Sequence, residues 1–100
     1  MQFSRDLRAR VADGTVTVSY RLWSRPKVRV GGTYRSGEVT IEVDDVDVVP
    51  FSSITEDELA RTGEPDVESL RRRAAHAGPI DDDTLVHRVE FHVMARHELG

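Results

Sequence analysis

Hydrophobic and polar residues alternate most regularly near the start of this chain of 100 residues. Residues 15–21 read Thr-Val-Thr-Val-Ser-Tyr-Arg, and this period of two predicts a strand. Its valines and tyrosine suit a core, while its hydroxyls and arginine suit either solvent or a ligand. Residues 22–32 contain a proline and two glycines and predict a long loop. Within that loop residues 27–30 alternate, so a short edge strand is possible there.

Two further stretches predict the rest of a sheet. Residues 33–35, a Ser36-Gly37 turn and residues 38–49 have the pattern of a β-hairpin. The alternation of the second arm breaks near residues 44–45, which predicts a β-bulge. Residues 84–94 predict the last strand.

Three helices are predicted from their start and stop signals. The first runs from Ser4, a potential cap, to about residue 13, before Gly14. The second begins at Thr55, where a glutamate three residues later completes a capping box, and it ends at Gly63. The third is capped by Asp66 and is followed by Gly-Pro.

These elements predict one α+β domain over residues 1–100. We expect the order β-α-β-β-β-αα-β, with short connections. A small mixed sheet or β-barrel with helices at its ends satisfies this order.

Composition excludes several classes of protein. No apolar run approaches the roughly 20 residues of a membrane span, and the first residues lack the apolar stretch of a signal peptide. The chain has no cysteine, and its four histidines show no metal-binding spacing. We therefore expect a cytoplasmic protein with no metal and no other cofactor.

Charge is unevenly distributed along the chain. Its net charge of −4 argues against non-specific binding to duplex nucleic acid. Residues 14–37 nevertheless carry five basic and no acidic residues, whereas residues 38–70 carry eleven acidic residues and one basic residue. This segregation permits a local positive field on an acidic protein. The alternative is that the charges even out in space.

Several segments resemble ASCH domains of the PUA-like superfamily. The opening stretch 3–23, the continuation 25–35, the helical stretch 54–63 and the closing residues 87–92 (His-Arg-Val-Glu-Phe-His) carry the likeness through their order and spacing. The chain is most similar to short, stand-alone actinobacterial members. The resemblance implies a bacterial protein with a PUA-like small mixed β-barrel and an RNA- or nucleotide-facing groove.

The hallmark of that family is Gly-x-Lys-x-x-x-x-Arg. Gly14 and Arg21 match it, but Val16 stands at the lysine position. Similar proteins hydrolyse N-acetylated cytidine with that lysine, a threonine and a glutamate. Ser19 occupies the threonine position and Glu64 lies beside the glutamate position, so they are the candidate catalytic residues. Serine needs a base to act as a nucleophile, and valine supplies none.

The candidate ligand groove extends from Gly14 to Arg29. Arg21 would bind phosphate or a base edge through its planar fork, and Trp23 would stack on a base. A lone tryptophan is also a common core anchor. The candidate binding residues are Gly14, Thr15, Thr17, Ser19, Arg21, Trp23, Arg25, Lys27 and Arg29.

Three hypotheses follow for function. The first is a non-catalytic domain that binds RNA, a nucleoside or a nucleotide. The second is a small hydrolase of a modified nucleoside or of RNA, with Ser19 as nucleophile and Glu64 as base. The third is a protein-interaction domain that uses the acidic surface of residues 38–68. The Arg71-Arg72-Arg73 run is interpreted as the solvated face of a helix.

Overall fold

The computed structural model describes residues 3–75 and 78–97. Its elements, in chain order, are α1 (Arg5–Ala12), β1 (Val18–Arg21), β2 (Thr33–Ser36), β3 (Val39–Pro50), the 3-10 helix η1 (Phe51–Ser53), α2 (Glu56–Thr62), α3 (Val67–Ala74) and β4 (Leu85–Arg96).

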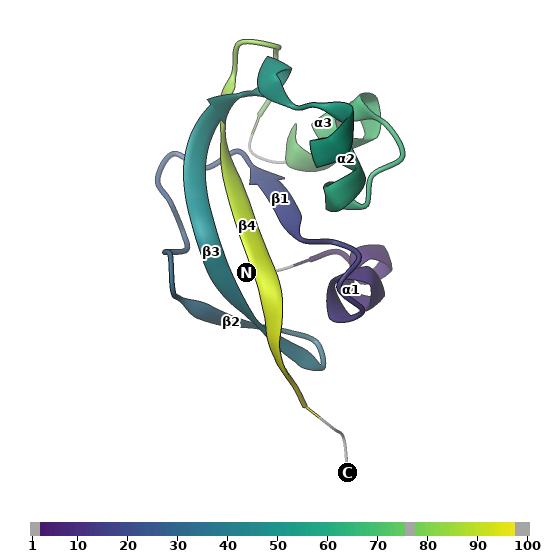
Figure 1. Cartoon of the computed structure of the whole chain (residues 1–100). Helices are drawn as coiled ribbons and strands as arrows, with labels where there is room; N and C mark the ends of the chain where they lie inside the picture. The colour runs from purple at the N-terminus through teal and green to yellow at the C-terminus, as the bar shows by residue number, and fades with distance from the viewer. Residues whose placement is uncertain (1–2, 76–77, 98–100) are drawn as a thin grey trace.

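The strands form one antiparallel sheet in the order β1-β4-β3-β2 (Figure 1). The α+β class is confirmed. Two details differ from the expectation: the sheet is open and antiparallel and does not close into a mixed barrel, and in the described residues no strand precedes α1. The two edge strands, β1 and β2, are four residues long and do not pair with each other.

The two long strands hold most of the sheet together. β3 and β4 pair over their whole lengths, with a register shift between Val43 and Asp45 that confirms the predicted bulge. β1 is shorter than expected, because the amides of Val16 and Thr17 donate to carbonyl oxygens of Arg10 and Arg61 outside the sheet. Residues 27–30 are not a strand.

Local capping explains where the helices begin. Thr55 accepts a hydrogen bond from the amide of Glu58 at 3.2 Å, and Asp66 accepts one from the amide of Ser69 at 2.7 Å, so both predicted caps are confirmed. Ser4 occupies the cap position of α1, but its side chain does not cap the helix. The Ser4 hydroxyl instead accepts a hydrogen bond from Arg73.

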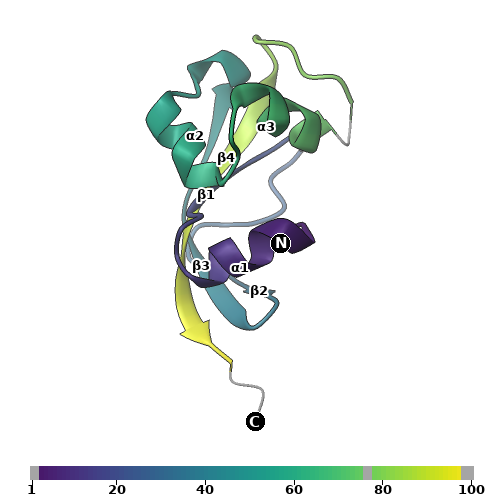
Figure 2. The same cartoon turned by 90° about the vertical axis from the view of Figure 1, so that its right-hand side faces the viewer.

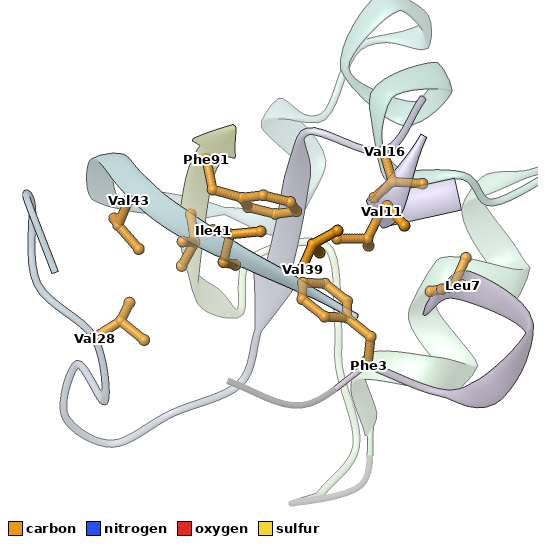
Figure 3. Close-up of a cluster of buried hydrophobic side chains, with 11 residues drawn as sticks. Phe3, Leu7, Val11, Val16, Val28, Val39, Ile41, Val43 and Phe91 are labelled. Atoms are coloured by element: carbon orange, nitrogen blue, oxygen red, sulfur yellow. The ribbon is translucent and has the colours of Figure 1, made fainter. Parts of the chain in front are cut away.

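The larger core cluster packs α1 against one face of the sheet (Figure 3). Phe3 and Phe91 meet in its centre with ring centroids 5.4 Å apart. Its buried members are Phe3, Leu7, Val11, Ala12, Val16, Val28, Val39, Ile41, Val43, Val89 and Phe91.

A second cluster joins α3 and η1 to the other end of the sheet. Its buried members are Val18, Tyr20, Phe51, Leu70, Ile80 and Val86. Strand β1 contributes Val18 and Tyr20 to this second cluster, whereas Val16, just before the strand, belongs to the first. The start of β1 therefore crosses the boundary between the two clusters.

The helices in the described part of the chain are all too short to cross a bilayer.

Candidate functional site

A cavity of about 460 Å³ opens between the two core clusters. The beginning of α1, strand β1, the end of α2 and the inner face of α3 form its walls. Figure 2 shows α1 below α2 and α3, with β1 behind them. The lining residues are Phe3, Ser4, Leu7, Val16, Val18, Ser19, Tyr20, Arg21, Leu22, Trp23, Lys27, Thr62, Glu64, Leu70, Arg73 and Ala74.

Arg21 is held at the end of β1 on the wall of this cavity. Its Nε donates to Ser19 Oγ at 2.8 Å, because residues two apart in a strand share a face. Its guanidinium carbon lies 5.1 Å from the centroid of the Phe3 ring, a cation–π distance. Burial lowers the pKa of Arg21, but an arginine side chain stays charged at neutral pH. The cavity therefore has a fixed, partly desolvated cation on its wall.

Trp23 stands at the same wall, half-buried. Its ring centroid lies 5.7 Å from that of His87, and its side chain packs against the larger core cluster. His87 is buried, and its Nδ1 has no hydrogen-bond partner among the described residues. Trp23 thus packs against the larger core cluster on one side and lines the cavity on the other.

An ion pair between Glu64 and Arg73 forms another part of the lining. The side chain of Glu64 is 4% exposed and accepts a hydrogen bond from Arg73 Nε. Arg73 also reaches Asp6 Oδ2 at 3.0 Å. Burial opposes the charged form of Arg73, but its hydrogen bonds with Asp6 and Glu64 outweigh this and raise its pKa.

Sequence reasoning missed Arg73 as a residue of this site. It placed all three consecutive arginines on a solvated face. Successive helical residues point about 100° apart, so three in a row span about 200° of the helix and need not share one environment. Arg71 lies over the ring of Phe51 at 4.5 Å, and Arg73 faces the cavity, which leaves Arg72 exposed. That geometric rule was the signal available in the sequence.

The structure gathers five of the predicted site residues around the cavity: Ser19, Arg21, Trp23, Lys27 and Glu64. The other five candidates, Gly14, Thr15, Thr17, Arg25 and Arg29, do not line it.

The five residues away from the cavity have other surroundings. Gly14 has a φ of +84° and turns the chain after α1, with no atom within 4 Å of where a Cβ would lie. The amide of Thr15 donates to Asp13, and Thr17 Oγ1 accepts from Arg61 Nε at 3.0 Å. Arg25 and Arg29 are exposed on the loop.

The hydrolase residues are not arranged as a nucleophile and its base. Ser19 Oγ accepts from Arg21, and the Glu64 carboxylate is paired with Arg73. Among the described residues no hydrogen bond joins Ser19 to Glu64. Val16, at the hallmark lysine position, is 2% exposed and packs in the larger core cluster.

One group of side chains away from the cavity could hold a metal ion. Glu42, Asp44 and His92 bring ligand-type atoms within 4.8 Å of one another on the exposed surface of β3 and β4. His92 Nδ1 lies 2.8 Å from Asp44 Oδ1, and Nε2 lies 3.5 Å from Glu42 Oε1. The hydrogen bond with Asp44 raises the pKa of His92. This arrangement is that of an imidazole between two carboxylates.

No protein-family model and no curated protein matches this chain. Two solved structures share its fold. The ASCH domain from Lactobacillus crispatus JV V101 aligns with a TM-score of 0.70 and 20% identity, over 88% of this chain and 70% of that one. The hypothetical protein PH0355 aligns with a TM-score of 0.70 and 15% identity, over 94% of this chain and 96% of that one. The fold is thus that of an ASCH domain, which confirms at the level of the fold the resemblance seen in the sequence.

Proposed function

We propose that this chain binds RNA, or a nucleoside or nucleotide, in the cavity between its two core clusters. The observation that carries the proposal is the placement of Arg21 beside Trp23 on one wall of a cavity of about 460 Å³. Ligand sites commonly have volumes of about 300–1,000 Å³, with a mainly apolar lining and a few oriented polar groups. A single nucleotide unit belongs to this size class.

The wall residues suit the two parts of a nucleotide. The guanidinium of Arg21 is oriented by Ser19, and its planar donors match phosphate oxygens or a base edge. The half-buried ring of Trp23 offers a stacking surface, and Lys27 adds an exposed cation to the same lining. RNA-binding domains generally take unstacked bases in this way.

Binding without turnover is the form of the proposal that the side chains favour. A serine nucleophile needs a neighbouring base, and the candidate base, Glu64, is paired with Arg73. The acidic surface of residues 38–68 gives less support to a protein-interaction role, because Glu58 is paired within the chain with Arg88, which also contacts Asp45.

The fluorescence of Trp23, the only tryptophan, tests the proposal directly. We expect uridine 5′-monophosphate and short single-stranded RNA to change it in a saturable manner, with an apparent Kd that rises with salt. Analysis of the same mixtures, and of N-acetylcytidine, by chromatography should show no product.

Two results would count against the proposal. A Trp23 fluorescence signal that stays constant with every nucleotide and RNA would show that the cavity does not bind these ligands. Product that forms with the intact chain and disappears in Ser19→Ala would replace binding by hydrolysis. Arg72→Ala, at an exposed arginine that does not line the cavity, serves as the control substitution.

A further inference from the structure

A second hollow lies on the other side of helix α1. It is a groove of about 430 Å³ between α1 and the β2–β3 hairpin, which lie side by side in Figure 2. Its lining residues are Arg5, Arg8, Ala9, Arg35, Ser36, Gly37 and Glu38.

Three arginines give this groove its charge. Arg5 and Arg8 are three apart and therefore lie on one face of α1, and the small side chain of Ala9 leaves room beside them. Arg35 faces them from β2. All three are exposed, so a ligand can reach them from solvent.

Backbone contacts fix two of these guanidinium groups. Arg8 Nε donates to the carbonyl of Phe3 at 3.2 Å, and Arg35 Nε donates to the carbonyl of Gly37 at 3.1 Å. Within the described residues, the terminal nitrogens of these two arginines make no further hydrogen bond or ion pair. They are therefore oriented donors that the fold itself does not use.

The remaining polar groups do not cancel this charge. Glu38 is the one acidic residue of the lining, and Arg96 pairs with it at 3.3 Å. Ser36 is 6% exposed, and its buried hydroxyl has no hydrogen-bond partner among the described residues. Buried hydroxyl groups normally have a partner. The groove therefore combines a positive charge with an unused hydroxyl donor at its wall.

We propose that this groove binds a phosphate group of the same RNA strand whose nucleotide occupies the cavity. This inference rests on the proposed function. Phe3, Ser4 and Leu7 line the cavity, while Arg5 and Arg8 line the groove, so a strand passes from one to the other across a single helical turn. Arginine forks bind phosphate oxygens bidentately, and such contacts carry no base preference.

The test compares uridine 5′-monophosphate with an oligouridylate of about six nucleotides, a length within the range that small single-strand sites cover. Trp23 fluorescence reports the cavity, and the backbone amide NMR signals of Ser36 and Gly37 report the groove. The variants are Arg35→Ala and the double substitution Arg5→Ala with Arg8→Ala. Arg72→Ala is the matched control, because this exposed arginine lines neither hollow.

We expect the oligonucleotide to bind more tightly than the mononucleotide, and each groove variant to weaken it about three- to tenfold while leaving the mononucleotide unaffected. Each lost phosphate contact should also reduce the slope of log K against log salt by about 0.7. Arg72→Ala should change neither affinity.

The two proposals fail in different ways. If the mononucleotide changes Trp23 fluorescence but the groove variants bind the oligonucleotide as tightly as the parent chain, the groove proposal is wrong and the cavity proposal stands. If Ser36 and Gly37 respond in an arginine-dependent manner while Trp23 does not respond to either ligand, the groove binds phosphodiester and the cavity proposal is wrong. If neither Trp23 fluorescence nor the Ser36 and Gly37 signals respond to either ligand, the cavity proposal and the groove proposal are both wrong.

Discussion

Two arginines on neighbouring strands have opposite surroundings. Arg88 on β4 lies opposite Tyr20 in the register of β1, and Arg21 lies opposite the next residue, His87. Arg88 Nη2 donates to Glu58 Oε1 at 3.0 Å and to Glu90 Oε1 at 2.8 Å. Arg21 Nε donates to the neutral hydroxyl of Ser19 and stands against an aromatic ring.

The pKa values of these two arginines shift in opposite directions. Burial disfavours the charged form of Arg88, but its hydrogen bonds with Glu90 and Glu58 outweigh this and raise its pKa. For Arg21 burial is the cause, and it lowers the pKa. The first arginine is neutralised by carboxylates that join β4 to α2. The second places a cation on a cavity wall, where an anionic ligand gains most from it.

Removing the Arg88 side chain tests the structural half of this comparison and should have the largest effect. Arg88→Met removes the cation shared by Glu58 and Glu90 and leaves them only the half-exposed Arg61, at 3.8 Å and 3.1 Å. We expect a loss of roughly 2–3 kcal/mol in the free energy of unfolding, near the lower end for a broken buried pair because both carboxylates are partly exposed. Urea denaturation measures it. A loss as small as that of the exposed Arg72→Ala, about 0.5 kcal/mol or less, would contradict the structural role.

Gly63 lies between the two sites just compared. It ends α2, which carries the Arg88 partner Glu58, and it immediately precedes Glu64, which lines the cavity. Its φ is +81°, and a Cβ there would lie 2.7 Å from Val16 Cγ2 and 3.1 Å from Leu7 Cδ2. Gly63→Ala should cost about 2–3 kcal/mol, from left-handed backbone strain plus overpacking. Gly14 is the matched control, with a φ of +84° and open space, so Gly14→Ala should cost only about 1 kcal/mol. Equal thermal stabilities of the two variants would rule out the steric contribution.

Arg21→Ala tests the ligand half of the comparison. The substitution removes a charge-assisted contact with the ligand, so affinity for single-stranded RNA should fall about tenfold, which corresponds to about 1.4 kcal/mol. Its effect on the free energy of unfolding should be smaller than that of Arg88→Met, because no carboxylate of β4 or α2 loses its cation. The two variants are compared by Trp23 titration and urea denaturation. If both variants lost stability equally and RNA affinity were unchanged in Arg21→Ala, the distinction would fail.

The sequence predicted the local elements well where one signal dominates. The capping residues Thr55 and Asp66, the helix end at Gly63 and the bulge at Val43/Asp45 were all predictable, because each depends on a few neighbouring residues. The hydrophobic alternation also gave the β2–β3 hairpin and β4. Sheet closure depends on pairing between distant strand edges, which periodicity does not specify, and the barrel expectation failed there.

The candidate site was predictable in part for a related reason. Ser19, Arg21 and Trp23 gather because they follow one another along one strand and its exit. Arg73 is about fifty positions further along and reaches the cavity only through the packing of α3 against the second core cluster. Thr17 lies on the predicted face of the strand, but its hydroxyl accepts a hydrogen bond from Arg61. That contact depends on where α2 packs.

His92→Gln should have the smallest effect on stability, and it extends the comparison of Arg88 and Arg21 to a solvent-exposed cation. The imidazole lies between Asp44 and Glu42 on the paired surface of β3 and β4, and the hydrogen bond with Asp44 raises its pKa. A pKa that is higher in the folded state stabilises the fold fully below the unfolded value of about 6.5, and this contribution is lost as pH rises through the folded pKa. His92→Gln should therefore be less stable than the parent chain near pH 5.5 and equally stable near pH 8.5.

Thermal unfolding at both pH values measures the difference, and a deficit that is the same at both would show that His92 acts through packing. Because this ion pair is solvent-exposed, the pH-dependent difference should stay well below the loss caused by Arg88→Met, where the carboxylates surround a largely buried cation.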